Sequence, residues 1–145
     1  MARVLIVPCG CRGRALAAEL RAAGHAVRGT TRDPAHAGPI AAAGAEPYVG
    51  DPDRIATLMD ALHGVTVLCW LMGGSLAAVP ELHAGRLRMM FEKLVDTPVR
   101  AVVYEGTPEG EALARACAET WQIPLAVLAP GAPPLPAVLG LLDAA

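Results

Sequence analysis

The sequence predicts an α/β fold of three layers, in which a doubly wound sheet of about six parallel strands lies between two layers of helices. Short apolar runs alternate with amphipathic segments along most of the 145 residues. The runs 4–7 and 65–71 are almost wholly apolar, as expected of strands buried on both faces of a parallel sheet. Hydrophobic residues form 54% of the chain and aromatic residues only 3%, so the core is built from aliphatic side chains. This alternation continues without a change of composition, which predicts a single domain over residues 1–145.

The first half of the chain gives three expected strands and three expected helices. In helix 12–23, Leu16 and Leu20 are spaced to face the sheet, and Gly24 is a typical C-terminal stop. The segment 34–43 is a weaker helix because Gly38 and Pro39 interrupt it. Helix 53–62 rests on apolar residues at i, i+3, i+4 and i+7. The expected strands of this half are 4–7, 25–31 and 45–49.

The second half continues the same alternation. We expect strands 65–71, 99–104 and 125–128, a loop over 72–78, and helices 80–95 and 109–121. A proline-rich link over 130–136 leads to a short apolar helix at 137–142. Because the segment 133–145 has little polar surface, we expect it to bury itself on the domain or on a second copy, with Trp70 and Trp121 as further covers of an exposed edge. A homodimer is therefore one predicted outcome.

Charge and composition argue against several classes of partner. The net charge is −2 and both signs are interspersed, which argues against binding to nucleic acid or an anionic membrane. No apolar run reaches the roughly 18 residues of a membrane span, and the first residues lack the pattern of a signal peptide. The four cysteines show no disulfide-scaffold spacing. We therefore expect a cytoplasmic protein with reduced thiols.

The turn after the first strand carries the clearest functional motif. Residues 8–13 read Pro-Cys-Gly-Cys-Arg-Gly, which is P-x-G-x-x-G where the dinucleotide fingerprint of a Rossmann-like fold has G-x-G-x-x-G. Gly10 would let the backbone approach a pyrophosphate, Gly13 would let helix and strand pack closely, and Pro8 replaces the glycine of the tight turn. The turn residues Cys9, Gly10, Cys11, Arg12 and Gly13 are thus candidate cofactor ligands. The alternative is that the two glycines serve packing alone.

The end of the second strand is where such folds select their cofactor. Thr31 and Arg32 follow Gly13 by 18 and 19 positions, where an acidic residue binds the 2′-hydroxyl of NAD and an arginine accommodates the 2′-phosphate of NADP. Arg32 therefore favours NADP. Asp33 leaves NAD as a less favoured cofactor, although it is better placed to begin the next turn. The alternative for Arg32 is an ordinary solvated charge.

Three segments in this order resemble a known family. GRALAAELRAAGHAVRGTTRDP, GAEPYVGDPDRIATLMDALHGVTVLCWLMGG and VRAVVYEGT are similar to the NAD(P)-binding half of the atypical and extended short-chain dehydrogenases/reductases, including NAD-dependent epimerase/dehydratase and NmrA-like proteins. The resemblance covers about residues 3–107. It implies that Gly10 and Gly13 line the pyrophosphate and that Arg32 takes the 2′-phosphate. It further implies that Asp51 contacts the adenine, unless Asp51 caps the next helix, and that Leu71, Met72 and Gly73 lie along the nicotinamide-side ribose.

The departures from this family bear on catalysis. Its reductases carry a Tyr-x-x-x-Lys pair on the helix after the fifth strand, where the lysine lowers the tyrosine pKa for acid–base work. Here the only lysine is Lys93, before that strand, and Tyr104 lies within it. The substrate-binding half is also missing. We therefore predict no catalytic residues and a non-catalytic, NADP-preferring dinucleotide-binding module with a sensor or regulatory role.

Two other functions remain open. In the first, a partner completes the active site of an NAD(P)-dependent enzyme, with Thr107, Tyr104 or Cys11 taking part. In the second, the fold serves association and binds no nucleotide. The Cys9-x-Cys11 spacing lacks a second pair and predicts small apolar side chains rather than a metal site. Glu105, Glu109 and Glu111 are expected to form a charged helix start.

Overall fold

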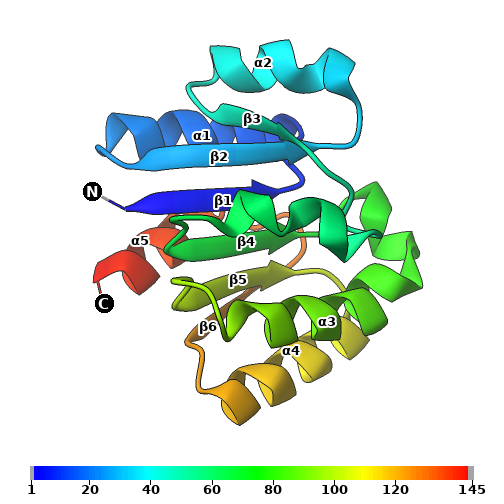
Figure 1. The fold of residues 1–145 in the computed structure, drawn as a ribbon. Coiled ribbons are helices and arrows are strands. Elements are labelled where there is room, and N and C mark those ends of the chain that lie inside the picture. Colours follow the sequence, from blue (N-terminus) through cyan, green and yellow to red (C-terminus); the bar gives the residue numbers. More distant parts are fainter. Residues whose placement is uncertain (1, 144–145) are drawn as a thin grey trace.

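The computed structural model describes residues 2–143, apart from the side chain of Ser75, and contains one sheet of six parallel strands (Figure 1). The strand order is β3-β2-β1-β4-β5-β6, and every neighbouring pair is parallel. This order is that of a doubly wound Rossmann-type sheet, whose switch point lies between β1 and β4. The predicted fold class is confirmed. The strands are β1 (Arg3–Val7), β2 (Ala26–Thr31), β3 (Glu46–Val49), β4 (Val67–Leu71), β5 (Ala101–Glu105) and β6 (Leu125–Leu128).

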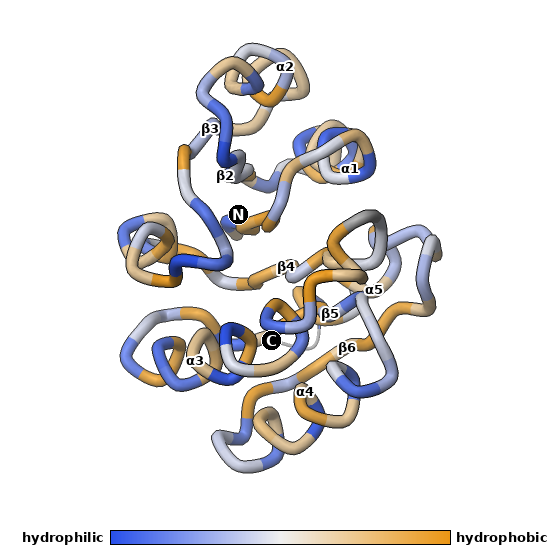
Figure 2. Tube along the Cα trace, turned by 90° about the vertical axis from the view of Figure 1, so that its right-hand side faces the viewer, coloured by the Kyte–Doolittle hydropathy of each residue, from blue (hydrophilic) through white to orange (hydrophobic). Residues whose placement is uncertain are grey.

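Helices cover both faces of the sheet. The helices on one face are α1 (Cys11–Ala22), α2 (Ala37–Ala42) and α5 (Leu135–Asp143), and those on the other are α3 (Gly85–Leu94) and α4 (Pro108–Trp121). Figure 2 looks onto the carboxyl ends of the strands and shows α1 and α5 on one side of the sheet and α3 on the other. Each face has its own apolar core. One contains Leu16, Leu20 and Val138, and the other contains Leu87 and Phe91.

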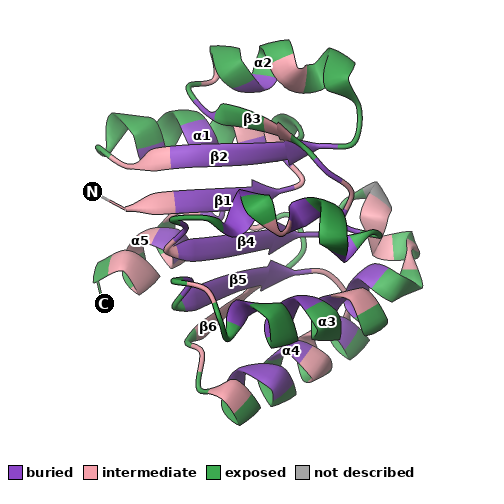
Figure 3. Ribbon diagram, in the orientation of Figure 1, coloured by how far each residue is buried: buried purple, intermediate pink, exposed green. Residues whose placement is uncertain are grey.

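The central strand β1 explains why the sheet is buried on both sides. Val4 and Ile6 belong to the core under α1, whereas Leu5 and Val7 belong to the core under α3 and α4. All four side chains are 0% exposed, and Figure 3 shows the burial continuing across β4 and β5. Burying one such side chain is worth roughly 1.5–3 kcal/mol. The continuous apolar run is therefore sufficient to fix β1 at the centre of the sheet.

Two helices expected from periodicity differ in the structure. The segment 53–62 forms two short 3₁₀ helices, Ile55–Leu58 and Asp60–Leu62, rather than one α-helix. Its buried residues Ile55, Leu58 and Ala61 recur every three positions, which is the period of a 3₁₀ helix. The α-helical prediction rested on Ile55, Leu58, Met59 and Leu62, and the structure shows that the type of helix was wrong. Three of these four residues, Ile55, Leu58 and Leu62, are buried.

The expected helix 80–95 is also divided. A 3₁₀ helix covers Pro80–His83, Ala84 has the non-helical dihedrals φ −137° and ψ −108°, and α3 begins at Gly85. His83 is buried, and its Nδ1 lies 2.6 Å from the hydroxyl of Tyr104 in β5. The weak helix 34–43 is likewise split, into a 3₁₀ helix at Pro34–His36 and α2. A further 3₁₀ helix, Ser75–Ala78, lies within the expected loop 72–78.

The C-terminal helix packs on the chain's own sheet. Helix α5 begins at Leu135, two residues earlier than expected, and buries Val138 among residues of β4, β5 and α1. Residues 144–145 of the predicted apolar segment lie outside the described residues. Trp70 was expected at an exposed edge, but it is 0% exposed and its indole N–H donates to the carbonyl of Leu82 at 2.9 Å. Among the described helices, none combines the length and apolarity required to cross a membrane.

Candidate functional site

The turn between β1 and α1 presents free backbone amides to the carboxyl edge of the sheet. Gly10 precedes the first residue of α1, and no side chain caps this end of the helix. The first N–H groups of a helix have no partner within it, and they carry the positive end of its dipole. Gly10 is exposed, and a Cβ added there would meet nothing within 4 Å, so a ligand can approach this backbone. The helix start is therefore suited to an anion.

Gly13 fills the packing role that its spacing predicts. A Cβ at this position would lie 3.0 Å from Cγ2 of Ile6 and 3.1 Å from the carbonyl oxygen of Pro8. Gly29 in β2 serves the same turn, which the sequence did not reveal. A Cβ at Gly29 would lie 2.6 Å from both Cβ and Sγ of Cys9. The turn thus rests directly on β1 and β2, and neither glycine tolerates a side chain without displacement.

Cys9 anchors this turn. Its N–H donates to the carbonyl of Thr30 at 2.8 Å, and its side chain is only 3% exposed. Burial raises the pKa of the Cys9 thiol from 9.0 to about 11. Cys11, the first residue of α1, is exposed. All four cysteines are free thiols, and among residues 2–143 no group of three or more potential ligands could hold a metal ion.

A cleft of about 790 Å³ lies in front of the turn. We call it the main cleft. It is walled by the turn, by the ends of β2 and β3, and by the segment after β4. Its lining residues are Pro8, Cys9, Gly10, Arg14, Thr30, Thr31, Arg32, Asp33, His36, Gly50, Asp51, Pro52, Asp53, Leu76, Val79 and Leu82. The structure therefore brings together Cys9, Gly10, Thr31, Arg32 and Asp51 from the predicted set.

The charged side chains around the main cleft differ in whether they form hydrogen bonds within the described part of the chain. Asp33 accepts a hydrogen bond from the N–H of Ala35 at 2.9 Å and caps the 3₁₀ helix there, as its position after β2 predicted. Within the described part of the chain, no hydrogen bond or ion pair engages the guanidinium of Arg14 or Arg32. Both cations line the cleft together with His36. This arrangement leaves two cations available to an anionic ligand.

Thr31 and Asp51 shape the loops at the cleft. The Thr31 hydroxyl donates to the carbonyl of Asp33 and accepts from its N–H, each at 3.1 Å. Oδ1 of Asp51 accepts from the N–H of Asp53 at 2.9 Å in a turn, but the helix that Asp51 was expected to cap does not begin there, because the next 3₁₀ helix starts at Ile55. Asp51 lines the main cleft, and its predicted contact with an adenine stays a prediction.

A smaller cavity of about 290 Å³ lies at the start of α1. We call it the turn pocket. It shares Pro8, Gly10 and Leu76 with the main cleft. The ring of Pro8 lines both spaces and does not close them. The remaining lining residues are Cys11, Arg12, Gly13, Leu71 and Gly74.

The loop after β4 does not present all the predicted residues to the site. Leu71 lines the turn pocket, as predicted, but Met72 is 0% exposed and its side chain belongs to the core under α3 and α4. Gly73 lies against Glu105: a Cβ there would be 2.5 Å from its carboxylate. Gly74 and Leu76 line the pocket in their place. The alternation of side chains along an extended segment explains why Met72 turns inward.

Arg12 has a different partner from the one predicted. Its Nη1 donates to Oε1 of Glu105 at 2.6 Å, and its Nη2 donates to the carbonyl of Ala132 at 2.9 Å. Oε2 of Glu105 accepts from the N–H of Gly131 at 2.9 Å. Glu105 is 0% exposed and is the last residue of β5, so the expectation that it belongs to a charged helix start was wrong. A carboxylate ending an otherwise apolar strand was the available signal.

Tyr104 faces the core rather than the site. Its hydroxyl lies 2.6 Å from Nδ1 of His83 and accepts from the N–H of Thr107 at 3.1 Å. Burial is the main cause that raises its pKa. Thr107 caps α4, since its Oγ1 accepts from the N–H of Gly110 at 3.0 Å. Lys93 is exposed on α3. None of these residues lines the main cleft or the turn pocket.

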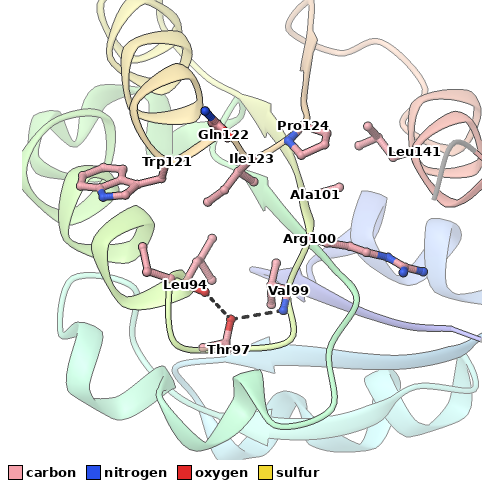
Figure 4. A pocket seen from close by; sticks show the side chains of 11 residues that line it. Leu94, Thr97, Val99, Arg100, Ala101, Trp121, Gln122, Ile123, Pro124 and Leu141 are labelled. Carbon is pink, nitrogen blue, oxygen red and sulfur yellow. Dashed lines mark hydrogen bonds between the residues drawn. The ribbon is translucent and has the colours of Figure 1, made fainter.

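A separate depression lies at the amino edge of the sheet. It has a volume of about 400 Å³ and is lined by Leu94, Trp121, Ile123 and Leu141 among other residues (Figure 4). The Thr97 hydroxyl, drawn near the bottom of Figure 4, donates to the carbonyl of Leu94 at 2.8 Å. Ligands of open α/β sheets bind outside the carboxyl ends of the strands. The main cleft and the turn pocket are therefore the candidate site.

Solved structures share this fold. The chain superimposes on a triphenylmethane reductase of Citrobacter sp. complexed with NADP(H), with a TM-score of 0.67, 19% identity, and coverage of 88% of this chain and 48% of that one. It matches an NADPH-dependent quinone oxidoreductase of Escherichia coli at a TM-score of 0.63 and 17% identity, over 86% of this chain and 46% of that one. The chain also matches vestitone reductase of alfalfa (Medicago sativa) with a TM-score of 0.69 and 12% identity. This match covers 89% of this chain and 56% of the reductase.

These likenesses establish a Rossmann-type fold of the kind found in NAD(P)-binding reductases. The chain spans about half the length of the first two reductases it matches. No protein-family model and no curated protein sequence matches the chain.

Proposed function

We propose that this chain is a binding module for an NADP-type dinucleotide and that it holds this ligand chiefly by the adenosine half. The observation that carries the proposal is the main cleft itself. A space of about 790 Å³ opens in front of the amide-rich start of α1, with Arg14 and Arg32 available at its wall. Backbone amides and two cations suit a ligand with several phosphate groups.

Each part of the cleft has a role in this proposal. The amides from Gly10 to Gly13 would hold the phosphates at the 5′ side, and Arg32 would take the adenosine 2′-phosphate. Asp51, which lines the same cleft after β3, would contact the adenine. The solved structures add support, because two of the reductases that share the fold are described as NADP(H)-bound or NADPH-dependent. When bound, such a cofactor supplies hydride chemistry.

We further propose that the module has a sensor or regulatory role without a catalytic apparatus of its own. Acid–base catalysis needs a titratable group within reach of the reacting atoms. The phenol of Tyr104 is engaged by His83 and by Thr107 in the core, and burial raises its pKa, which opposes its use as a base. Lys93 is exposed on α3, and α3 covers the face of the sheet opposite to α1.

A second candidate is an enzyme whose substrate half comes from another chain. The support for it is length: the reductases of the same fold are about twice as long as this chain. Oxidation of NADPH in the presence of a quinone, followed by absorbance, tests this function. A flat trace with the isolated chain and with any chain that co-purifies with it would end this candidate.

The experiment for the first candidate is a calorimetric titration with NADP and NAD. We expect NADP to bind more tightly, and Arg32→Ala to weaken NADP by roughly 1–3 kcal/mol while changing NAD little, since it removes a charge-assisted hydrogen bond. Arg54→Ala is a matched control, because Arg54 is exposed outside the cleft lining. Absence of binding by either dinucleotide at millimolar concentration would refute the proposal.

The predicted homodimer and the cytoplasmic location belong to the proposal as well. Helix α5 covers its own sheet, so a dimer would use other apolar surface, such as Val49, Met89 and Val95. Light scattering at several concentrations measures this directly, and a constant monomer mass would remove the dimer from the proposal. The free thiols support a reducing compartment.

A further inference from the structure

The ion pair between Arg12 and Glu105 spans the switch point of the sheet. Arg12 belongs to α1, which follows β1, and Glu105 is the last residue of β5. In the sheet, β4 lies between these two strands. A side chain that starts beyond β1 and reaches the end of β5 must cross the carboxyl end of β4. The contact of 2.6 Å between Nη1 and Oε1 therefore places the guanidinium over this end of the sheet.

The segments after β4 and β6 join the same contact. Gly73, after β4, packs so closely on the Glu105 carboxylate that an added Cβ would lie 2.5 Å away. Gly131, after β6, donates its N–H to Oε2 of Glu105 at 2.9 Å, and Ala132 accepts from Arg12 at 2.9 Å. We call this set, formed by Arg12, Gly73, Glu105, Gly131 and Ala132, the closure. It joins the start of α1 and the end of β5 to the segments that follow β4 and β6.

A dinucleotide needs both sides of the switch point. One mononucleotide half lies over β1, β2 and β3, and the other lies over the second half of the sheet. The first side is open: the main cleft is lined by residues that follow β1, β2 and β3, with a wall from the segment after β4. The second side is occupied by the closure. No lining residue of the main cleft or the turn pocket follows β5 or β6.

The closure is also matched in charge and hydrogen bonding. Both oxygens of the Glu105 carboxylate have donors, and the residue is 0% exposed. A ligand that entered this side would have to separate the guanidinium from a buried carboxylate, which leaves the carboxylate uncompensated. The phosphate of such a ligand would also approach that negative charge. The closure thus opposes entry of the second half by its volume and by its electrostatics.

We propose that the site takes an adenosine bisphosphate and that the second mononucleotide of a dinucleotide makes no stabilising contact with the closed chain. This inference rests on the proposed function, since it concerns the same cleft. The ligand class is an adenosine that carries phosphates at the 2′ and 5′ positions. The cleft on the β1–β3 side, the amides at α1 and the cation Arg32 serve such a molecule without any group beyond Arg12.

The test is calorimetry on the unmodified chain with three probes: adenosine 2′,5′-bisphosphate, NADP and nicotinamide mononucleotide. We expect the first two to bind with dissociation constants within about threefold of each other, and the third not to bind at millimolar concentration. If NADP binds at least about tenfold more tightly than the bisphosphate, the inference fails while the proposed function stands. If neither binds, both fail.

A substitution of Glu105 tests whether its ion pair with Arg12 is what excludes the second mononucleotide. Glu105→Gln keeps the size of the side chain and an acceptor for Gly131 but removes the charge that holds Arg12. We expect the preference for NADP over the bisphosphate to rise by about fivefold or more, because the second side can then open. Glu109→Gln removes an exposed carboxylate outside the closure and is the matched control. An unchanged preference in a Glu105→Gln protein of normal melting temperature would overturn the assignment of the closure as the barrier.

Discussion

The hydroxyl of Tyr104 lies 2.6 Å from Nδ1 of His83, whose imidazole is buried. Nε2 of His83 lies 3.1 Å from the carbonyl of Leu76, which can only accept, so Nε2 carries the proton. Nδ1 then accepts from Tyr104, whose oxygen accepts from the N–H of Thr107 at 3.1 Å. A chain of three hydrogen bonds thus links the end of β5 to Leu76, which lines both the main cleft and the turn pocket.

The first prediction concerns this chain. Tyr104→Phe leaves the buried imidazole nitrogen of His83 and the part-buried N–H of Thr107 without their partner. We expect a loss of about 1–3 kcal/mol in the free energy of unfolding, measured by urea denaturation. Tyr48→Phe is the matched control, since Tyr48 is the only other tyrosine and is half-buried. Equal effects of the two substitutions would contradict the assigned network.

The second prediction concerns stability at alkaline pH. Burial raises the pKa of Cys9 from 9.0 to about 11 and that of Cys69 to about 12, and it raises the pKa of Tyr104 as well. Above about pH 9 the unfolded chain therefore binds fewer protons than the folded one, so the free energy of unfolding falls as pH rises. The contribution of these three groups to the free energy of unfolding is complete below about pH 9. It is lost as the pH rises through their pKa values in the folded chain.

The measurement is urea denaturation at several pH values between 8 and 11. Each such group contributes at most about 1.4 kcal/mol per pH unit to the slope. Cys9→Ala should flatten the decline relative to the unmodified chain, even if it lowers stability at all pH values. Cys11→Ala changes an exposed thiol and is the control. A decline that is equally steep in Cys9→Ala would show that this thiol is not a source of the pH dependence.

The third prediction compares two adjacent glycines after β4. An alanine at Gly73 would place its Cβ 2.5 Å from the Glu105 carboxylate, whereas one at Gly74 would meet nothing within 4 Å. We expect Gly73→Ala to lower the melting temperature by several degrees, as about 1–3 kcal/mol of overpacking does in a domain of this size, and Gly74→Ala to leave it nearly unchanged.

A double-mutant cycle separates this clash from a general intolerance of the loop. Glu105→Ala removes every Glu105 atom that the new Cβ would meet. In that background the cost of Gly73→Ala should shrink by at least about 1 kcal/mol, a coupling typical of residues in direct contact. Additive effects of the two substitutions would mean that Gly73 and Glu105 do not interact as described.

The fourth prediction concerns Arg28, a buried cation in β2. Its Nη1 donates to the carbonyls of Ala61 and His63 at 2.6 and 3.0 Å, and its Nε lies 3.1 Å from Oε2 of Glu46. Arg28→Met should cost about 2–4 kcal/mol in the free energy of unfolding, because two carbonyls lose their donor. Glu46→Gln should cost less than about 1 kcal/mol, since the Glu46 side chain is largely exposed. Thermal denaturation of both variants checks the order, and a larger effect of Glu46→Gln would reverse our account.

The elements that the sequence predicted correctly are those that depend on residues close together in the chain. The run 4–7 has no polar residue, so it can only be a strand or helix buried on all sides, and the glycine turn after it selects the strand. Gly13 was predicted to pack closely and does so, because its spacing from Gly10 is fixed by the start of a helix. The parallel sheet with helices on both faces followed from the alternation of strands and helices, which depends on the handedness of the crossovers rather than on particular residues.

The features that escaped prediction depend on distant partners. Glu105 looked like one of three acids at a helix start, and only the positions of Arg12 and Gly131 explain its burial. His83 had no neighbour in sequence to suggest a partner, and Tyr104 is 21 positions away. The segment 53–62 carries both an α-helical pattern, at Ile55, Leu58, Met59 and Leu62, and the three-residue spacing of Ile55, Leu58 and Ala61, so the sequence alone did not select the 3₁₀ type.

The bond between Arg12 and Ala132 joins residues 120 positions apart, so the closure is assembled from distant parts of the chain. During synthesis, all six strands leave the ribosome before Gly131 and Ala132 do. A nascent chain that stops at residue 128 would possess every strand but would leave Glu105 with Arg12 as its only side-chain partner. The closure can therefore form only after residues 131 and 132 have been synthesised, later than every strand of the sheet.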